Sequence, residues 1–133
     1  MVMYELDINY ILTEAMKNCE GESIINVYET LYNILAAKGF KQQFQKLDNE
    51  ASYIFIQSLQ DKTIDFQFVP PNMHHLNSDE WVIRIFKNYF ISVLCSVNPN
   101  FQFQLWCRLL YQETTTMNLM RKSIINPDTS ARE

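Results

Sequence analysis

Short runs of β-type residues alternate along this chain with longer runs of helical periodicity, and this alternation constrains the fold more than any other feature. Residues 2–6 and 10–16 are rich in Val, Ile and Tyr, and the turn Asp7-Ile8-Asn9 between them predicts an antiparallel hairpin. A helix is predicted to begin at residues 21–23, and Gly39 stands where its C-terminal cap belongs. Its apolar side chains follow the 3.6-residue period at Ile24, Val27, Tyr28, Leu31, Ile34 and Leu35.

The next stretch continues the alternation in shorter pieces. Residues 44–47 are predicted to form a strand that ends at Asp48. Residues 51–59 follow with a helical pattern, although some of their side chains also favour strands. Residues 64–69 alternate apolar and polar side chains as a half-buried strand does, and Pro70-Pro71 ends that strand.

Two long helices are predicted to complete the chain. Residues 71–76 form a loop, and Asn77 or Ser78 can cap a helix that runs to about residue 97. After a turn, the last helix extends from residue 101 to about residue 122. The order of elements is therefore ββαβαβαα. Strands separated by helices favour an α/β domain with a mixed sheet and helices on both faces.

Size and charge limit the classes of protein that fit. The 133 residues are enough for one domain with a core, and 47% hydrophobic content with two Gly and four Pro argues against a disordered chain. A net charge of −4 argues against a strong, non-specific grip on nucleic acid, so any DNA contact must depend on local placement of basic residues. No apolar run approaches the roughly 18 residues of a membrane span, which predicts no membrane partner.

The cysteines predict neither a disulfide framework nor a zinc site. There are three of them, Cys19, Cys95 and Cys107, and no pair has CxxC spacing. Cys95 and Cys107 lie among apolar helical neighbours, which favours core positions for both. Reduced thiols and the lack of a basic N-terminal signal region favour a nuclear or cytoplasmic location.

Two carboxylates stand at element ends where metal ligands are often found. Asp48 follows a predicted strand, and Glu80 lies in the first turn of a predicted helix. Phosphodiester chemistry with two metals needs acidic ligands that converge, and hard oxygen donors suit Mg²⁺ or Mn²⁺. A plainer interpretation makes Asp48 a turn residue and Glu80 a partner of the helix dipole. Spacing alone favours the plainer interpretation.

Basic and polar residues continue from Glu80 along one face of its helix. Arg84, Lys87 and Asn88 share a stripe with Glu80, where they could hold a DNA backbone. The same stripe is also what a solvated face with a Glu80–Arg84 ion pair would look like, and both interpretations can hold together. His74-His75 has no further His or Cys at ligand spacing, so a solvated pair that donates weakly to DNA is favoured over a metal site.

The chain resembles the integrase catalytic core of long-terminal-repeat retrotransposons and retroviruses, within the ribonuclease H-like superfamily. The most telling stretch is Gln45-Lys46-Leu47-Asp48-Asn49-Glu50-Ala51-Ser52. Residues 4–18 look like the central hairpin of the family. The similarity continues in one register through residues 69–71, 77–80, 83–88, 99–101, 105–106, 109–110, 118–119 and 125–127.

This resemblance implies a site and a reaction. Asp48 matches the second Asp and Glu80 the Glu of a D,D,E triad, and both would bind metal. Arg84 and Lys87 match helix positions that face DNA. The family binds two Mg²⁺ or Mn²⁺ ions and carries out 3′ processing and strand transfer on DNA, with element ends and target DNA as partners. A homo-oligomer is a further partner that the family implies.

The departures from the family pattern are as informative as the matches. The first Asp of the triad lies on the strand before the hairpin, and this sequence starts after that point. We therefore expect a truncated ribonuclease H-like core over residues 1–123, a tail over 124–133, and little or no activity from the chain alone. Trp81 stands where an Arg usually follows the Glu, and Cys19 and Gln42 stand where Arg and Pro are expected.

Two other functions stay open at this point. One is a non-catalytic DNA-binding or dimerisation module. The other is an inert relic of a decayed element, since losses of Arg to Cys, Trp and His fit single transitions in CG-containing codons.

Overall fold

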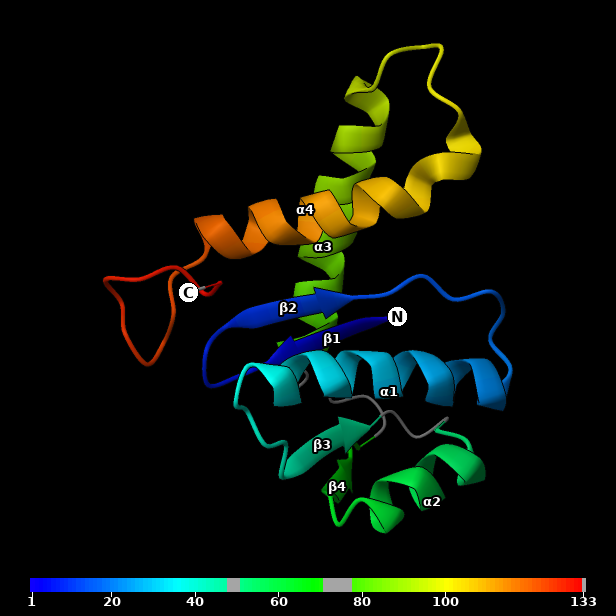
Figure 1. Ribbon diagram of the computed structural model, residues 1–133, viewed down its shortest axis with the longest axis vertical. Helices are drawn as coiled ribbons and strands as arrows, with labels where there is room; N and C mark the ends of the chain where they lie inside the picture. Colours follow the sequence, from blue (N-terminus) through cyan, green and yellow to red (C-terminus); the bar gives the residue numbers. More distant parts are fainter. Residues whose placement is uncertain (48–50, 71–77, 133) are drawn as a thin grey trace. The chain divides into compact units, whose positions relative to one another are not determined.

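A computed structural model describes residues 1–47, 51–70 and 78–132 of the chain (Figure 1). Over these residues the protein is mixed α/β, with four α-helices and two small sheets. The chain forms two compact units. The first unit comprises Met1 and Met16–Ser78, and the second comprises Val2–Ala15 and Asp79–Glu133.

The first unit contains a parallel pair of short strands and two helices. The two strands pair in register from Phe44 opposite Asp65 to Leu47 opposite Phe68. A helix connects them, because parallel strands need a crossover between the end of one and the start of the next. The elements in chain order are α1 (Gly21–Ala37), β3 (Phe44–Leu47), α2 (Tyr53–Asp61) and β4 (Asp65–Phe68).

The core of the first unit lies where α1 packs against α2. Tyr28, Leu31 and Leu35 of α1 are buried, which is the apolar stripe that the helical period predicts. The Tyr28 ring meets the ring of Phe55 on α2 edge to face, with the centroids 4.9 Å apart. Gly39 has a φ of 87° at the end of α1, where a side chain would be strained, so the predicted C-terminal cap is confirmed.

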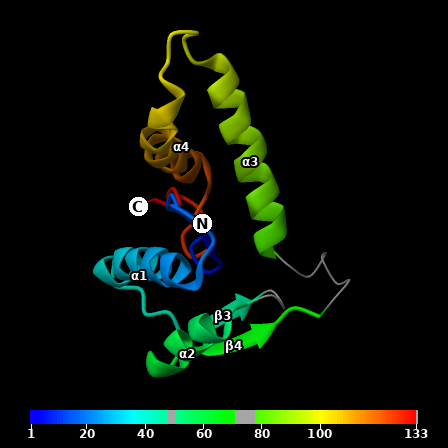
Figure 2. The same cartoon turned by 90° about the vertical axis from the view of Figure 1, so that its right-hand side faces the viewer.

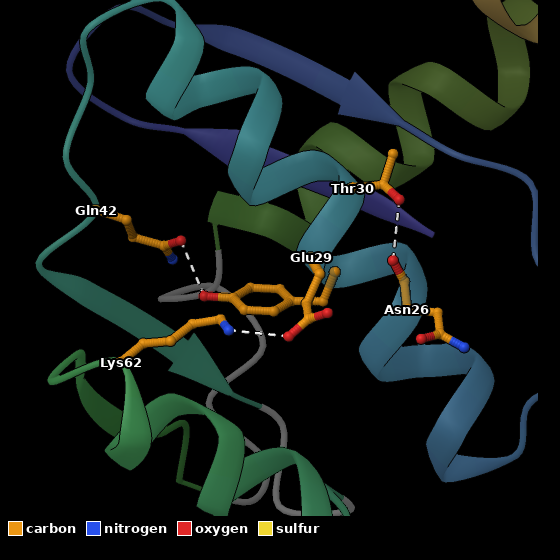
Figure 3. A network of polar contacts seen from close by, with 6 residues as sticks. Asn26, Glu29, Thr30, Gln42 and Lys62 are labelled. Carbon is orange, nitrogen blue, oxygen red and sulfur yellow. Dashed lines mark hydrogen bonds and ion pairs between the residues drawn. The ribbon is translucent and has the colours of Figure 1, made fainter.

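Polar contacts tie α1 to the segments that precede the two parallel strands (Figure 3). The Tyr28 hydroxyl donates to Gln42 Oε1 at 2.9 Å, in the loop before β3. Gln42 Nε2 in turn donates to the side-chain oxygen of Gln45 on β3. Lys62, which follows α2, forms an ion pair of 2.9 Å with Glu29 on α1. These contacts fix the approach to β3, the strand that precedes Asp48.

The buried phenol of Tyr28 should make the stability of the chain depend on pH. Burial, together with neighbouring Tyr32, raises the pKa of Tyr28 well above its ordinary value of 10.0, and the hydrogen bond to Gln42 opposes the rise. The folded chain therefore keeps a proton that the unfolded chain loses above about pH 10. Stability should be unaffected below that pH and fall above it by up to about 1.4 kcal/mol per pH unit.

Urea unfolding at a series of alkaline pH values measures this slope. The Tyr28→Phe variant is the control, because it keeps the buried ring but has no proton to lose. Its stability should fall less steeply with rising pH than that of the parent chain. Equal slopes in the two proteins would show that Tyr28 does not cause the dependence.

The second unit combines an antiparallel hairpin with two long helices. Strands β1 (Val2–Glu5) and β2 (Tyr10–Thr13) pair in register. Figure 2 shows the chain turning back after α3 (Ser78–Ser96) and returning as α4 (Trp106–Met120), which a 3₁₀ turn at Phe103–Leu105 precedes. The core joins β2, α3 and α4 through Ile11, Val82, Phe86, Leu110 and Met117.

A buried side chain of α4 closes the outer edge of β2. The Ile11 N–H donates to Asn118 Oδ1 at 2.9 Å, and Asn118 Nδ2 donates to the Ile11 carbonyl at 2.7 Å. Asn118 is fully buried and takes the place of a neighbouring strand. Thr114 lies one turn before Asn118 on α4 and is also buried. Its hydroxyl shares a hydrogen bond with the hydroxyl of Thr13. Two opposed residues in an antiparallel pair either bond to each other or both direct their backbone groups outward. Ile11 directs its groups outward to Asn118, so Tyr4, opposite Ile11, directs its own to the outer edge of β1.

The hairpin turn is bound to the end of α4. Asn9 has a φ of 60°, a conformation that Asn tolerates better than most residues. Its Oδ1 accepts from the Tyr4 hydroxyl at 2.9 Å and from Arg121, whose Nε also donates to the Asn9 carbonyl at 3.1 Å. Asn9 Nδ2 donates to the Lys122 carbonyl at 2.8 Å. After Arg121 the chain folds back, and the Ala131 N–H donates to the Arg121 carbonyl at 2.8 Å.

The predicted order of elements is found among the described residues, with shifted ends. The second strand was predicted over 10–16 and ends at Thr13, because its partner strand begins at Val2, opposite Thr13. The last helix was predicted from residue 101 and begins at Trp106, after the 3₁₀ turn. Both ends depend on pairing or packing that local patterns do not contain.

Two predictions differ from the structure. A single mixed sheet was predicted, whereas the described residues hold two separate two-stranded sheets, β1–β2 and β3–β4. Asn118 bonds to the backbone of Ile11 on the outer edge of β2, where a further strand would have to pair. Cys95 and Cys107 were predicted to be core residues and are exposed. The buried positions of α3 end at Phe86, and Cys95 lies further along the helix than Tyr89 and Phe90, which pack against the edge of the core.

Candidate metal and nucleic-acid site

Strand β3 brings the chain to the first candidate carboxylate. The strand ends at Leu47, which is buried and whose carbonyl accepts from Val69 N–H at 2.9 Å. The parallel pairing therefore extends to the end of β3. Asp48 is the next residue in the sequence, and it lies outside the described residues. His74 and His75 also lie outside them.

Helix α3 carries the second candidate carboxylate. The helix begins at Ser78, so Glu80 stands in its first turn, and its side chain is exposed. The N-terminal turn of a helix has a partial positive charge from its unpaired N–H groups, which favours a carboxylate there. An exposed carboxylate is also a hard oxygen donor of the kind that Mg²⁺ and Mn²⁺ prefer.

The polar stripe after Glu80 is on the solvent side of α3. Arg84, Lys87 and Asn88 are exposed, whereas Val82 and Phe86 of the same helix are buried in the core of the second unit. The polar stripe therefore lies on the opposite side of α3 from the hydrophobic core. Its two cations can approach phosphates without the cost of leaving a buried position.

Trp81 is a part of this surface that sequence patterns do not single out. It follows Glu80 and is 49% exposed. The guanidinium of Arg121 lies over its ring at 5.8 Å from the centroid, and over the ring of Tyr4 at 5.5 Å. These cation–π contacts bring together three segments that are far apart in the sequence, so spacing within one helix could not reveal them.

The donors suit the metal ions that the resemblance implies. Within residues 1–47, 51–70 and 78–132, no three His, Cys, Asp or Glu side chains gather closely enough to hold an ion. Asp48 is not among these residues, so Glu80 is the described member of the candidate pair. Its chemistry and exposure fit a divalent ion that is bound through oxygen.

The same described ranges include no helix that is both long enough and apolar enough to cross a membrane. No protein-family model matches the chain, and no curated protein sequence matches it. A function for this chain must therefore be argued from its own residues and geometry.

Proposed function

We propose that this chain carries the second and third carboxylates of an integrase-type catalytic core, a ribonuclease H-like domain that processes and joins DNA. The placement of Asp48 and Glu80 carries the proposal. β3 ends one residue before Asp48, and α3 begins two residues before Glu80. Asp48 thus follows a strand and Glu80 lies in the first turn of a helix, and both are positions where proteins often present ligands.

The chemistry of the site follows from its side chains. Asp48 and Glu80 would hold Mg²⁺ or Mn²⁺, since both are hard oxygen donors. Two such ions, when bound, supply Lewis-acid assistance at a phosphate and an activated oxygen nucleophile. Arg84 and Lys87 neutralise phosphates of the DNA along the exposed face of α3, and Asn88 can donate to phosphate oxygens there.

The proposed site needs one more carboxylate than this sequence offers. The first Asp of the triad belongs to a strand before the hairpin, and no residue of this sequence matches it. Among the described residues β1 pairs with β2 alone, so its outer edge can accept such a strand. The outer edge of β2 cannot, because α4 closes it. Two carboxylates hold ions more weakly than three, so we expect little or no catalytic activity from the chain by itself.

Manganese titration tests the proposal without any need for activity. Bound Mn²⁺ broadens the NMR signals of nearby nuclei. We expect Mn²⁺ to broaden the backbone amide signals next to Asp48 and Glu80 first. Either substitution, Asp48→Asn or Glu80→Gln, should weaken the effect at both positions, because one ion would need both ligands.

Glu22→Gln is the matched control for this titration. Glu22 lies in the first turn of α1 and is exposed, as Glu80 is in α3. Its substitution should leave the broadening near Asp48 and Glu80 unchanged. If Glu80→Gln leaves the Mn²⁺ broadening beside Asp48 unchanged, the two carboxylates do not share an ion. The proposal is then wrong.

Exposed apolar side chains near and along α4 favour a second candidate, a non-catalytic dimerisation module. Phe103, Tyr111 and Leu119 are 66%, 76% and 51% exposed, the first in the 3₁₀ turn and the other two about 80° apart around α4. Large apolar side chains that remain exposed are typical of protein contacts where they gather on one surface. Concentration-dependent association with no shared Mn²⁺ effect at Asp48 and Glu80 would favour the module.

A further inference from the structure

We propose that Trp81, supported from behind by Arg121, is a platform on which an unpaired nucleobase stacks next to Glu80. This inference rests on the proposed function and deepens it, since it assigns a single-stranded DNA segment to the same helix end. The contact would add recognition of an unpaired base to the phosphate contacts of the exposed stripe.

The platform is built from fixed parts of the second unit. Arg121 lies over the ring of Trp81, and both its Nε and its Nη2 donate to Asn9. Asn9 is itself bound by the Tyr4 hydroxyl. The guanidinium is therefore positioned before any ligand arrives. About half of the Trp81 surface is exposed, which leaves indole surface for a second flat group.

The residues that follow Trp81 on α3 are placed to contact the nucleotides next to the stacked base. At about 100° per residue, Asn88 lies within about 20° of Trp81 around α3, and Arg84 lies about 60° to one side. Arg84 and Asn88 are both exposed. From Trp81 to Asn88 the helix rises about 10 Å, which is the length of roughly three nucleotides of one strand. A stacking surface, a cation and an amide thus follow one another on one side of α3.

The indole at the Trp81 position suits a base better than a phosphate. Its ring carries no net charge and offers a flat π face on which a base can stack. The phosphates are attracted to Arg84 and Lys87 further along the helix. Aromatic side chains bind single strands in this way with little dependence on sequence, because every base has a π face.

The experiment uses the full chain and two DNA probes. One probe is a short duplex with a single-stranded extension, and the other is the same duplex with blunt ends. Trp81 and Trp106 are the two tryptophans of the chain, so a Trp106→Phe background makes the fluorescence report on Trp81 alone. We expect the extended duplex to quench this fluorescence and the blunt duplex to leave it nearly unchanged.

Affinity measurements with Trp81→Ala complete the test. The variant should bind the extended duplex about tenfold more weakly, because loss of one stacked base has that effect, and should bind the blunt duplex as before. Trp81→Phe should restore part of the loss. Trp81 is half exposed, so we expect both variants to fold, and their urea midpoints check this. Equal weakening for both probes, or no quenching by the extension, would overturn the inference.

The results separate this inference from the proposed function. If the extension quenches Trp81 while Glu80→Gln leaves the Mn²⁺ effect beside Asp48 unchanged, the stacking platform stands and the integrase-type site fails. If Mn²⁺ is shared but Trp81→Ala does not affect binding of the extension, the platform alone fails. Quenching that rises with protein concentration in the absence of DNA would make Trp81 a contact between copies of the chain and would also overturn the platform.

Discussion

Replacing Phe86 by alanine should lower the free energy of unfolding of the second unit by about 3–5 kcal/mol, which is the usual cost of removing a buried phenylalanine ring. Phe86 is 4% exposed and lies in the cluster that joins β2, α3 and α4. It also stacks on Phe90, with the ring centroids 5.9 Å apart. Val82 and Phe86 are the two buried side chains of α3 among the described residues, so the substitution removes one of the two.

Urea unfolding measures the effect of Phe86→Ala, and two variants make the result specific. Phe86→Leu keeps most of the volume and should cost less than about 1.5 kcal/mol. Phe103→Ala removes the same ring from a position that is 66% exposed and should change stability by less than about 0.5 kcal/mol. A loss at Phe103 as large as that at Phe86 would mean that the core of the unit does not lie where the structure places it.

Replacing Asn118 by alanine should lower the same free energy by about 3 kcal/mol. The substitution removes one acceptor and one donor, and it leaves both backbone groups of Ile11 without their partner. Each buried polar group that is left unsatisfied costs about 1–3 kcal/mol. Both groups belong to β2, so the substitution removes hydrogen bonds from the strand that contributes Ile11 to the core.

Hydrogen exchange identifies the cause of the Asn118→Ala effect. The Ile11 amide should lose protection more than that of Leu12, because the Leu12 N–H faces β1 and keeps its partner there. Asn88→Ala is the matched control, since Asn88 is exposed on α3 of the same unit. Its stability should stay within about 0.5 kcal/mol of the parent chain. Unchanged Ile11 protection in Asn118→Ala would refute the role of Asn118 as an edge partner.

Several elements of the fold could be predicted because their signals are local. The strand predicted over 44–47 is found as β3, since its bounds are set by neighbouring residues that favour extended backbone. The same holds for the start of α3 at Ser78, where a capping residue precedes an apolar period. The exposure of Arg84 and Lys87 also follows from the period, because Val82 and Phe86 occupy the buried face.

The candidate site was predictable only in part. Asp48 and Glu80 were placed at element ends by the same local signals, and their roles as metal ligands stay a prediction. The Trp81–Arg121 contact was not predictable, because Arg121 reaches α3 only after α4 has turned the chain back onto the hairpin. Arg121 and Asn9, which hold this arrangement, are 112 residues apart in the sequence.

Local patterns along the chain are enough to predict which segments become strands and helices and which side of α3 faces solvent, because these depend on residues within one or two turns of each other. The partners of the strands, in contrast, depend on the folded chain as a whole. Asn118 and Ile11 are 107 residues apart, yet their hydrogen bonds close the outer edge of β2, whereas among the described residues β1 pairs with β2 alone. A backbone hydrogen bond can be satisfied by any correctly placed group, and no local pattern shows which distant side chain will supply it.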